Sequence, residues 1–181
     1  MKKHHSIVYL TETALMAAIL CICGPQTIPI GPVPITLFTF ALSLCSVILG
    51  RWMAPLCVVV YLLLGMVGLP VFSGGGAGLA KIVGPTGGYL VGGIFHAFVG
   101  GLFAQKFIKK IPLVFLGQIL GLLVVYLIGT IWFMFVSHME LQSALAACVY
   151  PFVGVDCAKL AVASAIGIPV RRQLVKANLL K

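Results

Sequence analysis

Residues 24–36 read GPQTIPIGPVPIT, with four prolines and two glycines in thirteen positions. No continuous helix tolerates that density, because proline removes a backbone donor and glycine adds chain entropy. The stretch lies inside a run without any charged residue, from residue 13 to residue 50. The sequence therefore predicts that this run forms two helices, and that residues 24–36 connect them.

The amino-acid composition of the whole chain indicates that these helices lie in a membrane. Hydrophobic residues make up 61% of the 181-residue chain, charged residues only 8%, and the mean hydropathy is +1.19. A soluble core of this size cannot hide so many apolar segments. We therefore expect an integral all-α membrane protein, with one domain over residues 1–181, in contact with the lipid bilayer.

A helix needs about 20 residues to cross the hydrocarbon layer. The apolar runs predict six transmembrane spans, of which the second is short and the sixth is expected to bend at Pro151 and Gly154. The spans cover about 7–25, 37–51, 52–69, 87–108, 111–137 and 142–170.

Between the third and fourth spans, residues 71–86 read VFSGGGAGLAKIVGPT. The segment is too rich in glycine for a span and too apolar for an ordinary wet loop. Irregular backbone at membrane depth is tolerated where it lines or caps a cavity. We expect this segment to cap a pocket.

The basic residues predict the orientation. With both termini in the cytoplasm, ten of the twelve lysines and arginines fall at cytoplasmic ends, as the positive-inside rule requires. These residues also explain the net charge of +9 without a nucleic-acid partner. They are Lys2, Lys3, Arg51, Lys106, Lys109, Lys110, Arg171, Arg172, Lys176 and Lys181. Topology leaves only Lys81 and Lys159 unexplained, so both are candidate site residues.

Asp156 and Lys159 lie three residues apart within the sixth span, which places them on one helical face. Ionisable residues inside a bilayer are costly and normally serve function, although a structural ion pair would show the same spacing. At 1.5 Å per residue, Asp156 lies about 22 Å from Arg171 along the helix, in the outer half of the membrane. The predicted pocket therefore opens outward.

Sequence motifs for enzyme chemistry are missing. The chain has no GxxxxGK[ST], HExxH or GxSxG motif, and only three carboxylates. His96 has no partner histidine at metal-ligand spacing, and the six cysteines have no zinc spacing. We therefore predict no catalytic residue, no metal and no cofactor. Glu12 is expected to be solvated by water or by the basic termini near the cytoplasmic end of the first span.

Five ordered segments resemble one family. They are GPVPITLFTFA (31–41), YLLLGMVGLPVFSGG (61–75), GPTGGYLVG (84–92), GTIW (129–132) and PFVGVDCAK (151–159). Together they are similar to BioY, the biotin-specific substrate-binding component of energy-coupling-factor (ECF) transporters. The resemblance implies six transmembrane helices, a biotin site near the outer face, and a membrane coupling protein and ATPase subunits on other chains.

The resemblance also implies roles for individual residues. It makes Asp156 and Lys159 polar contacts to biotin, and it makes residues 71–86 the lid. Tyr89, Thr36 and Thr86 are candidate contacts, for which packing or helix capping is an equal explanation. Lys81 could attract the biotin carboxylate or reach the interface instead.

Ala14 and Ala18 lie one helical turn apart, a spacing that by itself favours packing within the bundle. The resemblance instead makes them a face for docking on the coupling protein. The chain departs from the family at Phe38, where a glutamine is frequent, and at Gly154-Val155, where Pro-Gly is frequent.

Two other classes compete with a binding component. A membrane-embedded enzyme or a structural membrane subunit could use the Asp156–Lys159 pair in another way. General acid–base catalysis usually needs further titratable groups nearby, and this chain has few. A structural subunit would not need an outward-opening lid.

Overall fold

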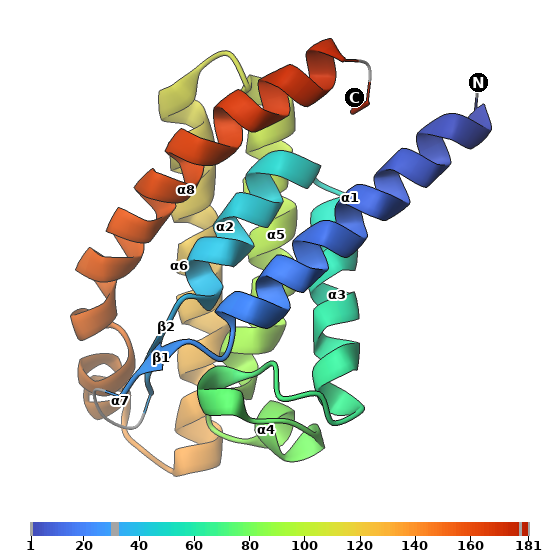
Figure 1. Cartoon of the computed structure of the whole chain (residues 1–181). Helices are drawn as coiled ribbons and strands as arrows, with labels where there is room; N and C mark the ends of the chain where they lie inside the picture. Colours follow the sequence, from blue (N-terminus) through green and yellow to red (C-terminus); the bar gives the residue numbers. More distant parts are fainter. Residues whose placement is uncertain (1, 30–32, 178, 181) are drawn as a thin grey trace.

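The computed structural model describes residues 2–29, 33–177 and 179–180, and it is a helical bundle (Figure 1). The main helices are α1 (Lys2–Cys23), α2 (Phe38–Leu49), α3 (Met53–Met66), α5 (Gly87–Phe107), α6 (Ile111–Ser137) and α8 (Tyr150–Lys176). The short elements are β1 (Thr27–Ile28), β2 (Ile35–Thr36), the 3₁₀ helix η1 (Ser73–Gly75), α4 (Leu79–Val83) and α7 (Leu141–Cys148).

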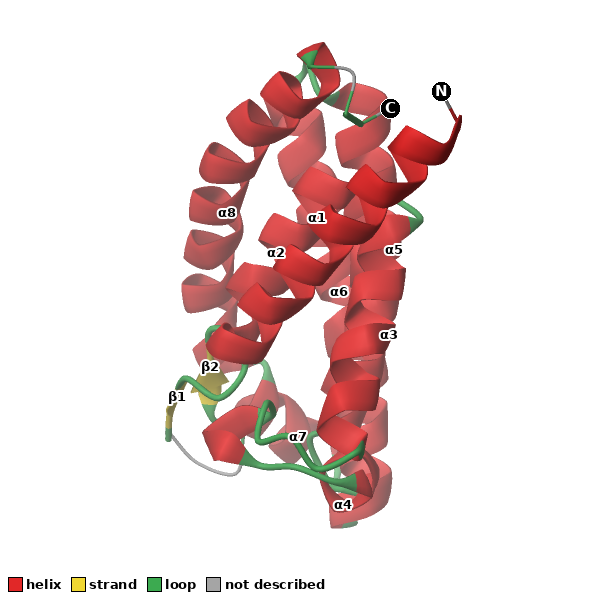
Figure 2. Ribbon diagram, turned by 45° about the vertical axis from the view of Figure 1, so that its right-hand side comes forward, coloured by secondary structure: helices red, strands yellow, loops and turns green. Residues whose placement is uncertain are grey.

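The two ends of the bundle differ. The beginning of α1 and the end of α8 lie at one end, which we call the terminal end (Figure 2). The β1–β2 hairpin, α4 and α7 lie at the other end, which we call the loop end. Among the described residues, the irregular connections between helices that are longer than a tight turn therefore lie at the loop end.

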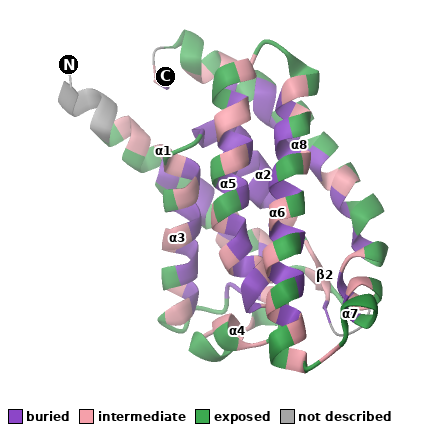
Figure 3. Ribbon diagram, turned by 180° about the vertical axis from the view of Figure 1, so that it is seen from behind, coloured by how far each residue is buried: buried purple, intermediate pink, exposed green. Residues whose placement is uncertain are grey.

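Apolar side chains cover the outside of the bundle. Within the described residues, α5, α6 and α8 are long and apolar enough to cross a membrane, whereas the apolar parts of α1, α2 and α3 are shorter. On α6 exposed large side chains recur every three or four residues from Leu116 to Phe135, and those in this series are Leu116, Leu120, Leu123, Leu127, Ile131 and Phe135. Figure 3 shows this exposed face on α6. Such a continuous apolar stripe is typical of a surface that faces lipid.

The short helix α2 lies at the centre of the bundle. Ten of its twelve residues are buried, and it packs against α1, α3, α5 and α8. The helices α2 and α8 approach each other closely at Gly167, where a Cβ would come within 2.8 Å of Val47 Cγ1. This packing fixes α8, which carries the predicted charge pair, against the helix that follows the proline-rich stretch.

The proline-rich stretch does separate two helices, as expected, but it also forms a small antiparallel hairpin. Thr27 pairs with Thr36, and Ile28 pairs with Ile35. The sequence did not predict this pairing. The residues 30–32 between the strands lie outside the described part of the chain.

The sixth predicted segment, 142–170, is wrong as one helix. The structure divides it at Val149 into α7 and α8, and α8 continues to Lys176. Pro151 lies in the first turn of α8, where its missing N–H costs nothing. A helix continuing from α7 would need that N–H, so Pro151 starts a helix here rather than bending one.

Candidate functional site

A cavity of about 70 Å³ opens at the loop end of the bundle, between α2, α5, α6 and α8. A single water needs only about 10–15 Å³ by the same measure, so this space is more than a packing defect. Its walls are mainly apolar and aromatic. The side chains with polar oxygen or nitrogen atoms that line it are Thr36, Thr39, Tyr61, Ser73, Thr86, Tyr89, Tyr126, Asp156 and Lys159.

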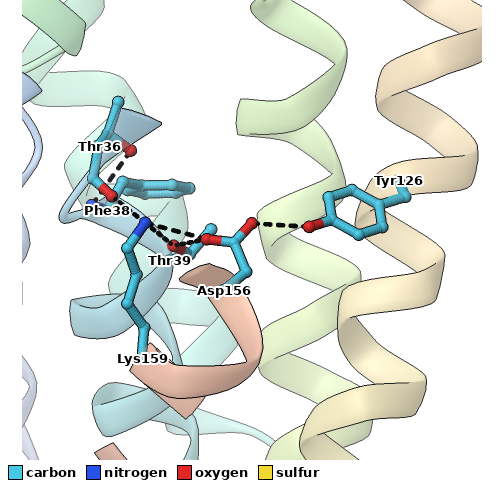
Figure 4. A network of polar contacts seen from close by, with 6 residues as sticks. All are labelled: Thr36, Phe38, Thr39, Tyr126, Asp156 and Lys159. Carbon is cyan, nitrogen blue, oxygen red and sulfur yellow. Dashed lines mark hydrogen bonds and ion pairs between the residues drawn. The ribbon is translucent and has the colours of Figure 1, made fainter. Parts of the chain in front are cut away.

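Asp156 lies at the centre of the polar part of this wall (Figure 4). The residue is 3% exposed. Its Oδ1 accepts hydrogen bonds from Thr39 Oγ1 and from Lys159 Nζ, each at 2.9 Å. Its Oδ2 accepts one from Tyr126 OH at 2.8 Å. Three elements, α2, α6 and α8, thus meet at one carboxylate.

Lys159 forms the expected ion pair with Asp156, and it is held by further acceptors. Its Nζ donates to the Thr36 carbonyl at 2.7 Å and is 3.3 Å from Thr39 Oγ1. With Asp156 Oδ1, the ammonium has three oxygen partners, which matches its three N–H donors. The charge is therefore satisfied before any ligand arrives.

Thr36 contributes to the site through its backbone, and its hydroxyl takes the capping role that was one of the two expected explanations. Its hydroxyl accepts a hydrogen bond from the Phe38 backbone N–H at 3.2 Å, at the start of α2. Its carbonyl, not its hydroxyl, contacts Lys159. The hydroxyl thus stabilises the beginning of α2, and the backbone of the hairpin supplies the polar contact in the cavity.

An aromatic cluster forms the wall next to the glycine-rich segment. The rings of Phe38 and Tyr61 stack with centroids 5.4 Å apart, and Tyr61 meets Phe72 edge-on at 5.6 Å. Tyr61 OH also donates to the Val71 carbonyl at 2.9 Å. Phe72 lies so close to Gly65 that any Cβ there would overlap its ring. The start of the 71–86 segment is therefore anchored to α3.

The structure brings Tyr89 and Thr86 to the same cavity. Tyr89 OH is 3.3 Å from Thr130 Oγ1, and its ring packs on Gly129, where a Cβ would overlap it. Thr86 precedes α5, but its side chain makes no capping hydrogen bond there. Capping therefore does not explain the Thr86 hydroxyl, whereas the Tyr89 ring has both a packing contact and a cavity position.

Lys81 lies outside the main cavity. It lines a shallower hollow beside it, together with residues of the hairpin and of α4. The two spaces share Pro34, Ser73 and Thr86 in their linings. The aliphatic part of Lys81 packs over Gly76, whose missing side chain leaves room for it.

Ala14 and Ala18 are both exposed on α1, while Thr13, Met16 and Ala17 are buried. The spacing of the two alanines alone suggested packing within the bundle, but their exposure shows that they do not pack there. They form part of an outward face of α1.

Sequence reasoning missed Thr39 and Tyr126, which are both partners of Asp156. Neither is charged, so neither stands out in an apolar segment. A usable signal existed for Tyr126, because it lies four residues from Leu122 and from Thr130 on the buried face of α6.

This arrangement suits reversible binding of a small molecule. A compact set of charged and hydroxyl groups lies on one side of an otherwise apolar and aromatic space, which is the usual composition of a ligand pocket. Among the described residues, no group of three histidine, cysteine or acidic side chains could hold a metal ion. The chemistry present is hydrogen bonding and charge, in a nearly dry setting.

Known proteins share this architecture. A family model described as "BioY family" matches residues 1–176. The chain is 38% identical to biotin transporter BioY2 of Lactococcus lactis subsp. cremoris over 93% of each chain. It is 37% identical to biotin transporter BioY of Thermotoga maritima, over 90% of this chain and 95% of that one. A crystal structure of the S-component for biotin from an ECF-type ABC transporter superposes with a TM-score of 0.88, at 30% identity over 95% of each chain.

Proposed function

This chain belongs to the BioY family, and we propose that it is the substrate-specific component of an ECF-type transporter, binding biotin tightly for uptake into the cell. It is a multi-pass protein of the cell membrane, and a transport protein rather than an enzyme. The observation that carries the proposal is the cluster of Asp156, Lys159, Thr39 and Tyr126 on the wall of a cavity.

Asp156 is the proposed acceptor for the two ureido N–H groups of biotin. A carboxylate offers about four acceptor positions, and Thr39, Lys159 and Tyr126 occupy three of them. One position remains for a first N–H. A second N–H requires the Thr39 or Tyr126 hydroxyl to turn away, which a hydroxyl can do because it also accepts hydrogen bonds.

Lys159 has a different proposed role. Since its three donors already have partners, it first serves to hold the Asp156 carboxylate in its orientation. It reaches the ureido oxygen only by giving up the Thr36 carbonyl or Thr39. The bond that is lost and the bond that is gained are both charge-assisted bonds from the ammonium to a neutral oxygen, so the exchange costs little.

The aromatic residues then hold the apolar part of the ligand. Phe38, Tyr61 and Tyr89 line the cavity, and they would pack against the sulfur ring and the aliphatic chain of biotin. Thr86 lies where the cavity meets the outer hollow that contains Lys81. These two residues are the proposed partners of the biotin carboxylate.

The loop end faces the outside in this proposal, and both termini are in the cytoplasm. The positive-inside rule supports this orientation. The basic residues that lie near span ends on the cytoplasmic side include Lys106, Lys109, Lys110, Arg172 and Lys176. Residues 71–86 would then act as the lid on the outward opening. Six membrane crossings follow if α1, α2 and α3 also span.

The proposed partners are an ECF coupling membrane protein and its ATPase subunits. The exposed Ala14 and Ala18 supply a surface of small residues on α1, which allows close approach of another helix. The chain would bind substrate, while ATP hydrolysis would take place on other subunits.

Calorimetric titration of the purified protein with biotin tests the proposal. We expect one site with a Kd in the nanomolar range, about −12 kcal/mol, and intact biotin recovered afterwards. Lipoate, a carboxylate with an aliphatic chain but no ureido group, is the matched control and should bind at least about 100-fold more weakly. Absence of biotin binding in a folded protein would refute the assignment, and altered biotin would favour a membrane enzyme.

A further inference from the structure

The hollow beside the biotin cavity, which we call the outer hollow, is larger than the cavity itself. It measures about 420 Å³, against about 70 Å³ for the cavity. One water needs only about 10–15 Å³ by the same measure, so a single carboxylate group would fill a small part of the outer hollow. Its walls come from the proline-rich stretch and from the 71–86 segment, both at the loop end (Figure 2).

The outer hollow adjoins the cavity. Pro34, Ser73 and Thr86 line both spaces, whereas Asp156 lines only the cavity and Lys81 lines only the outer hollow. In the proposed complex the ureido ring of biotin lies at Asp156, and the valerate chain leads toward Thr86. The carboxyl group is then the part of biotin nearest to the outer hollow.

Lys81 gives the outer hollow a positive charge. Among the described residues that line this space, Lys81 is the only charged one. It is partly buried, and its aliphatic stem packs over Gly76. Within the described part of the chain, its ammonium makes no hydrogen bond and no ion pair.

The other partly or fully buried cations differ from Lys81, because the fold itself supplies their acceptors. Lys159 has three oxygen partners. Arg171 donates to the Ile48 carbonyl at the end of α2, and Arg172 donates to the Ile108 carbonyl at the end of α5. A cation that is held by its stem, without an acid in the same hollow, is suited to an anion from outside the protein.

The wall of the outer hollow is open at Gly74. This residue has a φ of +68°, a conformation that glycine adopts without strain. A Cβ there would have no neighbour closer than Thr27 Oγ1 at 4.0 Å. The space beside Gly74 is therefore not filled by packing, in contrast to Gly65, where the ring of Phe72 occupies it.

We propose that the site also accepts biotin whose carboxyl group is joined through an amide to an amino acid. Biotin then lies in the cavity, the amide lies at its mouth beside Thr86, and the amino-acid carboxylate pairs with Lys81 in the outer hollow. The valerate carboxyl is the group of biotin that can be extended without changing the ureido or sulfur ring. This inference rests on the proposed function, because it requires the ureido ring at Asp156.

Displacement calorimetry with three ligands tests the inference on the wild-type protein. The ligands are biotin, biotinylglycine and biotinamide, and the last has the same amide but no carboxylate. Biotinylglycine should bind with a Kd within about tenfold of that of biotin. Biotinamide should bind about fivefold more weakly than biotinylglycine, the upper range for an ion pair that is partly exposed to water.

Lys81→Met assigns the difference to one residue. It removes the ammonium and keeps an unbranched apolar stem over Gly76. In this variant biotinylglycine and biotinamide should bind equally. Lys109→Met is the matched control, since Lys109 is an exposed lysine in the turn after α5, at the terminal end. It should preserve the fivefold difference between the two ligands.

Each outcome decides between the proposals. If biotin bound normally but biotinylglycine bound more than about 100-fold more weakly, the carboxyl end would be enclosed, and only the conjugate proposal would fail. A difference between the two amides that persisted in Lys81→Met would overturn the pairing with Lys81. If the wild type bound neither biotin nor its conjugates, the proposed function and this inference would fail together. The wild-type comparison does not depend on the folding of any variant.

Discussion

Replacing Asp156 with asparagine removes the negative charge from the cavity while keeping the size of the side chain. One carbonyl oxygen remains to accept a hydrogen bond, whereas the oxygens of Asp156 now accept three. The amide N–H₂ that replaces the other oxygen cannot accept from Tyr126 or from a ureido N–H. Both the free site and the proposed biotin complex should be weakened.

The magnitude for the free protein follows from Lys159. Breaking a buried ion pair costs about 3–5 kcal/mol, because the remaining charge is left without compensation. The Lys159 side chain is 11% exposed and keeps the Thr36 carbonyl and Thr39 as neutral acceptors. These contacts place the expected loss of stability at the low end, at about 3 kcal/mol.

The magnitude for biotin follows from the ureido contacts. A hydrogen bond to a charged group contributes about 1.5–3 kcal/mol, and the proposed carboxylate accepts two from biotin. Asparagine retains one of them in a neutral form. We expect a loss of about 3 kcal/mol in binding, or roughly a 100-fold increase in Kd.

Calorimetry with biotin and thermal unfolding without it measure the two effects separately. The double variant Asp156→Asn/Lys159→Met removes the uncompensated charge, so it should recover stability but not affinity. Glu140→Gln is the control, since Glu140 is an exposed carboxylate at the loop end of the bundle. A Kd for Asp156→Asn within about threefold of the wild type would refute the proposed ureido contact.

Three further predictions concern the cavity, the lid and the buried polar cluster of the bundle. Tyr126→Phe removes the 2.8 Å bond to Asp156 and frees an acceptor position for the second ureido N–H, so it should strengthen biotin binding by about 1 kcal/mol in the same titration; a higher Kd than that of the wild type would contradict this exchange. Gly65→Ala would force the ring of Phe72 away from α3, so biotin should dissociate faster in stopped-flow chase experiments, and a wild-type rate would disprove that this anchor holds the lid. Gln118→Leu removes the acceptor shared by two buried serines and a histidine and should lower stability by about 2 kcal/mol in thermal unfolding, whereas unaltered stability would show that these donors find other partners.

The positions of the main helices could be predicted because their signals are local. Proline and glycine at residues 24–36 exclude a helix wherever they occur, and the apolar run lengths on each side need no partner to be recognised. The expected segments 87–108 and 111–137 differ by no more than one residue at either end from α5 and α6. Asp156 and Lys159 were also visible locally, since a spacing of three puts them on one face.

The remaining features depend on distant parts of the chain. Thr39 meets Asp156 across 117 positions, and Tyr126 meets it across 30. No spacing rule connects uncharged residues over such separations. The hairpin from Thr27 to Thr36 was missed for a related reason, because its four strand residues are too few to show alternation.

The adjacent arginines near the end of α8 have a consequence for how the protein is made. Arg171 and Arg172 supply donors to carbonyls at the ends of α2 and α5, and both helices precede α8 in the sequence. During synthesis these earlier helices enter the membrane before their partners have been translated. Until α8 arrives, their terminal carbonyls must keep water or lipid headgroups as partners. A ribosome stalled before residue 171 would therefore leave helices that are inserted but not yet locked together, which is a form that membrane quality-control proteases could recognise.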